Sequence, residues 1–376
     1  MLHAKEAEQA CPARKKTSIG GQALMEGIMM RGPKMTAMAV RDPQGKIVIE
    51  ERETKGVKRP KICRLPIIRG IFGYIDSMTV GYQCLMRSAE LAGLEDAVEK
   101  KPDAADRDDG WTRVAPAEGN PAPEAETKSE GNEAKEAEEA KETKETKEEE
   151  KKLPQWVMSA MMVASVVLSL VLAVGIFIVV PMLLFKLLPE SARNTGNPAV
   201  DSLIKSAFEG VIKIALLVAY MGAISLMKDI RRTFMYHGAE HKTIFCYEAG
   251  LPLTVENVRR QRRFHPRCGT SFLILMLIVS IFTSFFIDPI SIAIGGNVLP
   301  TAARVAVKLA LIPLIVGIGY ELIKLAGRHD NLFTKIISAP GMWLQHVTVF
   351  EPTDDMIECA IAAVKQVIPD DGSDNW

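Results

Sequence analysis

The feature that most constrains this chain is an uncharged run, WVMSAMMVASVVLSLVLAVGIFIVVPMLLF, at positions 156–185. It exceeds the roughly 20 apolar residues that a helix needs to cross a bilayer. Three more apolar runs follow at 211–227, 271–287 and 305–326. The alternative for each run is a helix buried in a soluble core. The sequence therefore predicts a mainly α, polytopic membrane protein with a four-helix transmembrane domain at 154–328.

The distribution of charge predicts how these helices are oriented. The chain has 46 basic and 46 acidic side chains, but the connection 228–270 is strongly basic. Basic connections remain on the cytoplasmic side of a membrane, so we expect this loop and, with an even number of spans, both termini in the cytoplasm. The expected partners are the lipid bilayer and either another membrane protein or a second copy of the chain, with no nucleic acid. The basic residues of the connection are Lys228, Arg231, Arg232, Lys242, Arg259, Arg260, Arg262, Arg263 and Arg267.

The N-terminal segment, 1–64, is predicted to contribute strands to a small cytoplasmic α+β unit. Residues 36–51, TAMAVRDPQGKIVIEE, alternate as two strands around an Asp-Pro-Gln-Gly turn, which is typical of a β-hairpin. The next segment, 65–95, has apolar residues at helical spacing and polar residues opposite. It is predicted to be an amphipathic helix that packs on the unit or lies in the headgroup layer.

The C-terminal segment, 329–376, is predicted to complete the same unit. Residues 343–350, WLQHVTVF, alternate like a strand, and Thr353 can cap the helix that follows. Between the two ends, 96–153 is rich in Glu, Lys, Ala and Thr and lacks an apolar face, so it is interpreted as a solvated, disordered linker.

Two short motifs carry the candidate metal ligands. His237 and His241, in HGAEH, are four residues apart and share one face of a helix that is expected to continue from the second span toward Gly250. The string matches the inverted H-x-x-E-H order, in which two histidines bind zinc and the glutamate, here Glu240, is the general base. The alternative is a pair of histidines at the membrane interface.

The second motif, HPRCG, follows in the same basic connection. It resembles a zinc knuckle of the C-P-x-C-G kind in which His265 replaces the first cysteine and Cys268 is the second. Imidazole and thiolate together favour zinc. If all four candidates, His237, His241, His265 and Cys268, bind the ion, the site is structural. If only three bind, a water can occupy the fourth position and Glu240 can take its proton.

Two further glutamates are candidates for an assisting role. Glu321 lies in the last turns of the fourth span and is a ligand, a partner of Lys324 or Arg328, or a substrate contact. Glu26 is a lone acid in the glycine-rich segment 19–33, IGGQALMEGIMMRGP, which forms either a tight loop or part of a site.

The strings GGQALMEGIMMRGP, HGAEHKTIFCYEAG and HPRCGTSF resemble those of the YqhQ-like family of bacterial membrane proteins. The resemblance implies a bacterial plasma membrane and a metal-dependent enzyme, and it names no substrate. Two functions remain open. The first is a metal-dependent hydrolase that acts on a peptide or lipid bond at the cytoplasmic membrane face, with Glu240 as base and Glu26 or Glu321 assisting. The second is a non-enzymatic scaffold or accessory factor with a structural zinc site.

Overall fold

The computed structural model describes residues 16–54, 60–93, 110–114, 155–329 and 331–375. The chain divides into two units, one made of residues 1–116 and 188–376 and the other of 117–187. In the second unit the described elements are helix α3 (Gln155–Val174), a π-helical segment (Gly175–Val179) and α4 (Val180–Lys186). Most of the predicted linker 96–153 lies outside the described residues.

The first unit contains a five-stranded antiparallel sheet in which every strand pairs with its sequence neighbour. Its β3–β4 hairpin confirms the prediction for 36–51, and Gly45 adopts the positive φ (82°) that the turn requires. The glycine-rich segment, for which a tight loop and part of a site were both left open, forms the β1–β2 hairpin, with Met25 and Glu26 as its two-residue turn. The strands are β1 (Gly20–Leu24), β2 (Gly27–Arg31), β3 (Met35–Arg41), β4 (Ile47–Glu53) and β5 (Thr112–Val114).

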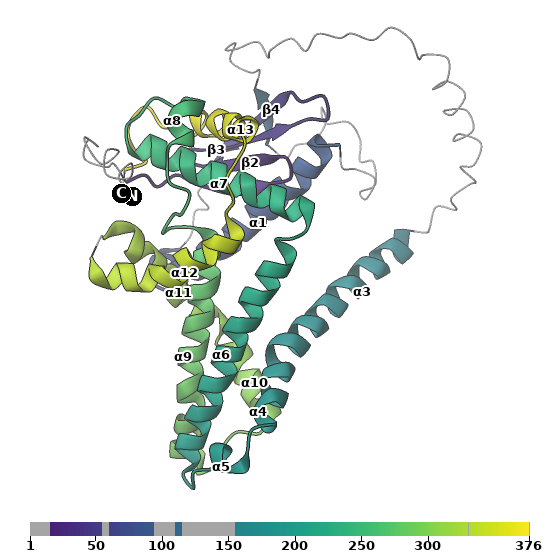
Figure 1. The fold of residues 1–376 in the computed structure, drawn as a ribbon, viewed down its shortest axis with the longest axis vertical. Helices are drawn as coiled ribbons and strands as arrows, with labels where there is room; N and C mark the ends of the chain where they lie inside the picture. The colour runs from purple at the N-terminus through teal and green to yellow at the C-terminus, as the bar shows by residue number, and fades with distance from the viewer. Residues whose placement is uncertain (1–15, 55–59, 94–109, 115–154, 330, 376) are drawn as a thin grey trace, which may run out of the picture. The chain divides into compact units, whose positions relative to one another are not determined.

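Helices cover both faces of the sheet (Figure 1). Helices α7 (Lys228–Glu248) and α13 (Asp354–Lys365) pack on one face and bury its larger apolar core. Helix α1 (Ile68–Leu91) packs on the other face and confirms the amphipathic helix predicted at 65–95. The short helix α8 (Val255–Arg259) joins α7 to the next motif. Both ends of the described chain therefore contribute to one α+β unit, since α13 contacts β2 and β3.

Both units also contain long apolar helices. Across the described residues, three helical stretches are long and apolar enough to cross a membrane, or four if the bent pair α10 (Thr301–Ala310) and α11 (Ile312–Arg328) is one span. The others are α6 (Pro198–Ile224), α9 (Gly269–Gly295) and the stretch Val167–Lys186 of the second unit. Helix α9 contacts α6 and α11, and a short α5 (Glu190–Arg193) precedes α6.

Two elements differ from the sequence prediction. The second span does not continue as one helix toward Gly250: α6 ends at Ile224, and α7 begins at Lys228 after a three-residue break. The strand predicted at 343–350 is instead the end of helix α12 (Leu332–Thr348), which starts with an Asn331 capping box. The alternation of apolar and polar residues at 343–350 does not mark a strand, because Leu344, Gln345 and Thr348 are buried at helical spacing in a helix that contacts α9.

Candidate metal centre

Helix α7 places two imidazoles one turn apart on the same side. His237 and His241 have ring centroids 4.5 Å apart, and His241 is almost fully buried. The helix is fixed by a close crossing at Gly238, where a Cβ atom would lie 2.0 Å from the carbonyl oxygen of Phe350. Phe350 also donates its N–H to the Phe234 carbonyl. The chain that follows α12 therefore holds α7 in place directly beside the two histidines.

Backbone carbonyls fix the tautomers of both rings. His237 Nδ1 lies 3.1 Å from the Thr348 carbonyl oxygen, and His241 Nδ1 lies 2.5 Å from that of Arg263. A carbonyl oxygen only accepts hydrogen bonds, so each Nδ1 carries a proton, and in the neutral form of each ring Nε2 has the lone pair. Zinc-binding histidines are oriented in the same way by second-shell acceptors.

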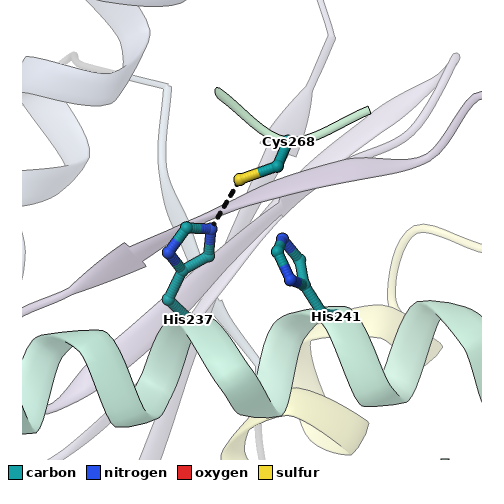
Figure 2. Close-up of side chains that lie close together, drawn as sticks. All are labelled: His237, His241 and Cys268. Atoms are coloured by element: carbon teal, nitrogen blue, oxygen red, sulfur yellow. Dashed lines mark hydrogen bonds between the residues drawn. The ribbon is translucent and has the colours of Figure 1, made fainter. Parts of the chain in front are cut away.

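The thiol of Cys268 faces these free nitrogens. Figure 2 shows the two rings rising from α7 toward the sulfur, with a dashed line from His237 Nε2 to Cys268 Sγ at 3.0 Å. One ligand atom from each of His237, His241 and Cys268 lies within 4.8 Å of the other two. Thr270 Oγ1 contacts the sulfur at 3.1 Å. Two imidazole nitrogens and one sulfur at this spacing can hold a metal ion.

His265 lies beside this group but directs its nitrogens elsewhere. Its ring centroid is 5.5 Å from that of His241, yet Nδ1 lies 3.2 Å from the Arg267 N–H and Nε2 lies 3.3 Å from the Arg267 guanidinium. A neutral imidazole has one acceptor nitrogen, so only one of these contacts can be a full hydrogen bond. Burial, with the nearby cationic side chains of Arg267 and Arg262, holds the pKa of His265 well below its usual value. The ring is neutral and is not among the three converging groups.

The turn that carries Cys268 is anchored by distant residues. Gln345, fully buried on α12, accepts from the His265 N–H at 2.8 Å and donates to the His265 carbonyl at 2.7 Å. The Arg267 guanidinium pairs with Glu248 at the end of α7 and donates to the Thr17 carbonyl at 2.6 Å. These contacts connect the turn to α12, to the end of α7 and to Thr17 near the start of the described chain.

Glu240 is buried beside the cluster, against strand β1. A Cβ atom on Gly21 would lie 2.8 Å from the Met29 carbonyl oxygen and 2.9 Å from the Glu240 side chain, so glycine is needed for this approach. Burial raises the pKa of the Glu240 carboxyl, against the opposing effects of His237 and of a hydrogen bond from the Gly21 backbone. The second glycine of GGQ therefore makes room for this acid.

The other two candidate acids form ion pairs away from the cluster. Glu26, with a positive φ of 51°, binds Arg232 of α7 through both carboxylate oxygens and accepts from the Tyr236 hydroxyl at 3.3 Å. Glu321 pairs with Arg69 of α1, whose Nε lies 2.7 Å from it. Arg69 was not among the partners proposed from sequence, which were Lys324 and Arg328.

Several contributors had no local sequence signal. The Thr348 and Arg263 carbonyls, Thr270 and Gln345 act through the fold, and no motif marks them. Gly21 lies in a recognisable string, GGQ. The residue it packs against in the fold, Glu240, lies in a different motif, so the sequence did not indicate their contact.

Comparison with known proteins places the chain in a family without assigning an activity. A family described as "Protein of unknown function (DUF1385)" matches residues 65–370. The "Uncharacterized protein YqhQ" of Bacillus subtilis (strain 168) is 31% identical over 354 residues, which covers 93% of this chain and 92% of that protein. No solved structure matches the chain. The chain thus belongs to the DUF1385 family, as its three motifs predicted.

Proposed function

We propose that this chain is a bacterial plasma-membrane protein with a zinc-type centre on its cytoplasmic side. The observation that carries the proposal is the direction of the ring nitrogens. Nδ1 of each α7 histidine lies against a backbone carbonyl, and a nitrogen of each ring lies close to the Cys268 sulfur. A mixed imidazole and thiolate set suits zinc better than oxygen-preferring cations. Because α7 and α8 lie in the basic connection, the rule that basic loops remain inside supports a cytoplasmic location with both termini on that side.

The best-supported activity is metal-dependent hydrolysis. Three converging ligands, rather than four, leave a coordination position for water or a substrate oxygen. A metal in this site would lower the pKa of a bound water and polarise a carbonyl or phosphoryl group. Glu240, one residue before His241 and buried beside His237, is the group that would accept the proton. Glu26 and Glu321 are held in ion pairs and would support the fold around the site rather than the reaction.

A structural metal site is the second candidate, and burial favours it. Cys268 and His265 are each only 4% exposed, and His241 only 1%. A metal held there would join α7 to the turn before α9 and stabilise the connection between the α+β unit and the apolar helices. In that case the chain is a scaffold or accessory factor for another membrane protein.

One set of variants separates the two functions. Zinc per chain is counted by elemental analysis in the purified full chain and in Glu240→Gln, Cys268→Ser and His265→Gln. We expect about one zinc in the wild type, in Glu240→Gln and in His265→Gln, and almost none in Cys268→Ser. The purified proteins are then incubated with the solubilised membrane fraction, and new lipid and peptide products are followed by mass spectrometry.

The hydrolase predicts products with wild type and none with Glu240→Gln at unchanged zinc content. The structural site predicts no products from either protein, and a lower thermal midpoint in Cys268→Ser but not in Glu240→Gln. A chain that purifies without any transition metal, and gains none when zinc is supplied, refutes both.

A further inference from the structure

Ionised side chains also gather among the apolar helices, away from the histidine cluster. Glu209 of α6 is buried, and three lysine ammonium groups lie within 4.0 Å of its carboxylate: Lys205 at 4.0 Å, Lys213 at 3.9 Å and Lys308 of α10 at 3.6 Å. The lysines therefore approach one carboxylate from the preceding turn, the following turn and a neighbouring helix.

A second buried pair joins α9 to α10 near the first. Asp288 of α9, 1% exposed, pairs with Arg304 and accepts from the Ser202 hydroxyl of α6. Arg304 and Lys308 are one turn apart on α10. Both groups of charges thus belong to one region between α6, α9 and α10. Helix α9 contacts the other two helices, and the Lys308–Glu209 pair joins α10 to α6.

This region carries more positive than negative charge. Four cations, Lys205, Lys213, Arg304 and Lys308, face two carboxylates, Glu209 and Asp288, which leaves a formal excess of two positive charges (4 − 2).

On α6, α9 and α10, all of whose residues the structure describes, the one further acid is Asp201. Asp201, one turn before Lys205, is half-buried and accepts from the backbone N–H and the hydroxyl of Thr195, both at 2.7 Å.

The position of the cluster makes this excess costly. Glu209 lies about 16 Å from the start of α6 and about 22 Å from its end, at 1.5 Å of rise per residue. Charges at such depth in an apolar helix are expensive unless they are paired, and they mark binding sites or transport paths.

The hydrogen-bonding capacity of the cluster is not used up. A direct ammonium–carboxylate hydrogen bond is about 2.7–2.9 Å long, whereas the three lysines lie at 3.6–4.0 Å from Glu209. Within the described part of the chain, Arg304 Nε and Asp288 Oδ1 are buried without a hydrogen-bond partner. Donors therefore remain for a further anionic group.

We propose that α6, α9 and α10 form a binding site for a phosphate group, held by Lys213 and Lys308 with Lys205 and Arg304. The phosphate belongs either to the headgroup of an anionic phospholipid or to inorganic phosphate. Inorganic phosphate would bring up to two negative charges and balance the excess, whereas a phosphodiester headgroup would bring one and reduce it. The unesterified oxygens of either group would accept from the unused donors. This site is independent of the zinc-type centre, and its function does not require a metal.

The test uses the full chain, delipidated in neutral detergent. Native mass spectrometry measures binding of phosphatidylglycerol and of phosphatidylcholine, and thermal unfolding compares sodium phosphate with sodium chloride at equal ionic strength. We expect about tenfold tighter binding of the anionic lipid, or a higher unfolding midpoint in phosphate, from the lysine charges. Preference for the lipid identifies a headgroup site, and stabilisation by phosphate alone identifies a site for the free anion.

Substitutions that remove either positive or negative charge from the cluster distinguish an anion site from a salt-bridge network. Lys213→Gln/Lys308→Gln should abolish the preference, and Glu209→Gln, which adds to the positive excess, should strengthen it. The exposed lysines Lys228 and Lys335 provide the control, since Lys228→Gln/Lys335→Gln should bind like the wild type.

A purely structural network predicts instead that Glu209→Gln weakens the protein as much as the lysine substitutions do, with no preference for either anion. That result overturns the proposal, as does a lysine double variant that retains the preference. If the double variant does not fold, Lys308→Gln alone and Glu209→Gln must still shift anion affinity in opposite directions.

Discussion

The two segments that build the candidate metal centre are held in different ways. Helix α7 supplies His237 and His241 at a spacing set by helical periodicity, and a backbone crossing at Gly238 holds the whole helix. The turn 265–268 supplies Cys268 and depends on side chains from other helices, above all Gln345. A helix can present ligands by local geometry alone, whereas a turn presents them only when the tertiary structure is complete.

This difference explains why His265 is the least secure of the four ligands inferred from sequence. Its neighbour Arg267 pairs with Glu248 and reaches Thr17, which are distant in the sequence. That network places a guanidinium against the His265 ring, and a cation there opposes the binding of a second cation. The spacing of HPRCG carries no information about where Arg267 points.

The largest effect is expected from breaking the support of α7. Gly238→Ala puts a Cβ atom 2.0 Å from the Phe350 carbonyl oxygen, so backbone must move. We expect a loss of about 3 kcal/mol of unfolding free energy, which outweighs the ~1 kcal/mol that alanine gains over glycine in a helix. Chemical unfolding in detergent, followed by circular dichroism, measures it. Gly20→Ala, where nothing lies within 4 Å of the new atom, is the control and should be nearly neutral. Equal stability of the two variants would contradict the close crossing.

The next-largest expected effect distinguishes two of the metal ligands, His241 and Cys268, from His265, which lies beside them. His241→Ala and Cys268→Ala each remove a converging atom, and we expect zinc affinity to fall by more than the roughly 100-fold that loss of a second-shell partner costs. His265→Gln removes a ring that faces Arg267 and should change zinc affinity less than tenfold. Competition with a calibrated chelator measures all three. If His265→Gln loses zinc as Cys268→Ala does, the site has four ligands, and the structural function gains over the hydrolase.

A smaller effect is expected from the anchor of the turn. Gln345→Leu keeps the volume on α12 but leaves the His265 N–H and carbonyl buried without their present partners. Each unsatisfied group costs about 1–3 kcal/mol, partly recovered by relaxation, so we expect a loss of about 2 kcal/mol. Thermal unfolding with and without zinc measures it. Bound zinc should recover part of the loss, because a metal would hold the turn in place of the amide. No change in the variant would mean that the turn is fixed by Arg267 alone.

The elements that the sequence predicted are those with local causes. The β3–β4 hairpin follows from alternation around a glycine turn, and the apolar stripe of α13 follows from helical periodicity. The strand expected at 343–350 was wrong because alternation over a few letters also occurs where a helix ends. The pairing of Glu26 with Arg232 and of Glu321 with Arg69 joins residues more than 200 positions apart, and no local pattern encodes it. The same limit applies to the carbonyls that fix the two histidine tautomers.

The smallest expected effect tests whether the Thr270 hydroxyl increases the zinc affinity of the neighbouring Cys268 thiolate. Thr270 Oγ1 lies 3.1 Å from Cys268 Sγ, and a hydroxyl that donates to a thiolate stabilises its charged, metal-binding form. Thr270→Val removes the hydroxyl and keeps the shape, so we expect zinc affinity to fall about tenfold, with a change of less than ~1 kcal/mol in stability without metal. The matched control is Thr79→Val on α1, where the lost hydroxyl donates only to a carbonyl within its own helix. If Thr270→Val binds zinc as tightly as Thr79→Val does, the hydroxyl does not stabilise the thiolate that binds the metal. The turn would then position the sulfur without activating it, and both the affinity and the reactivity of the centre would depend on α7.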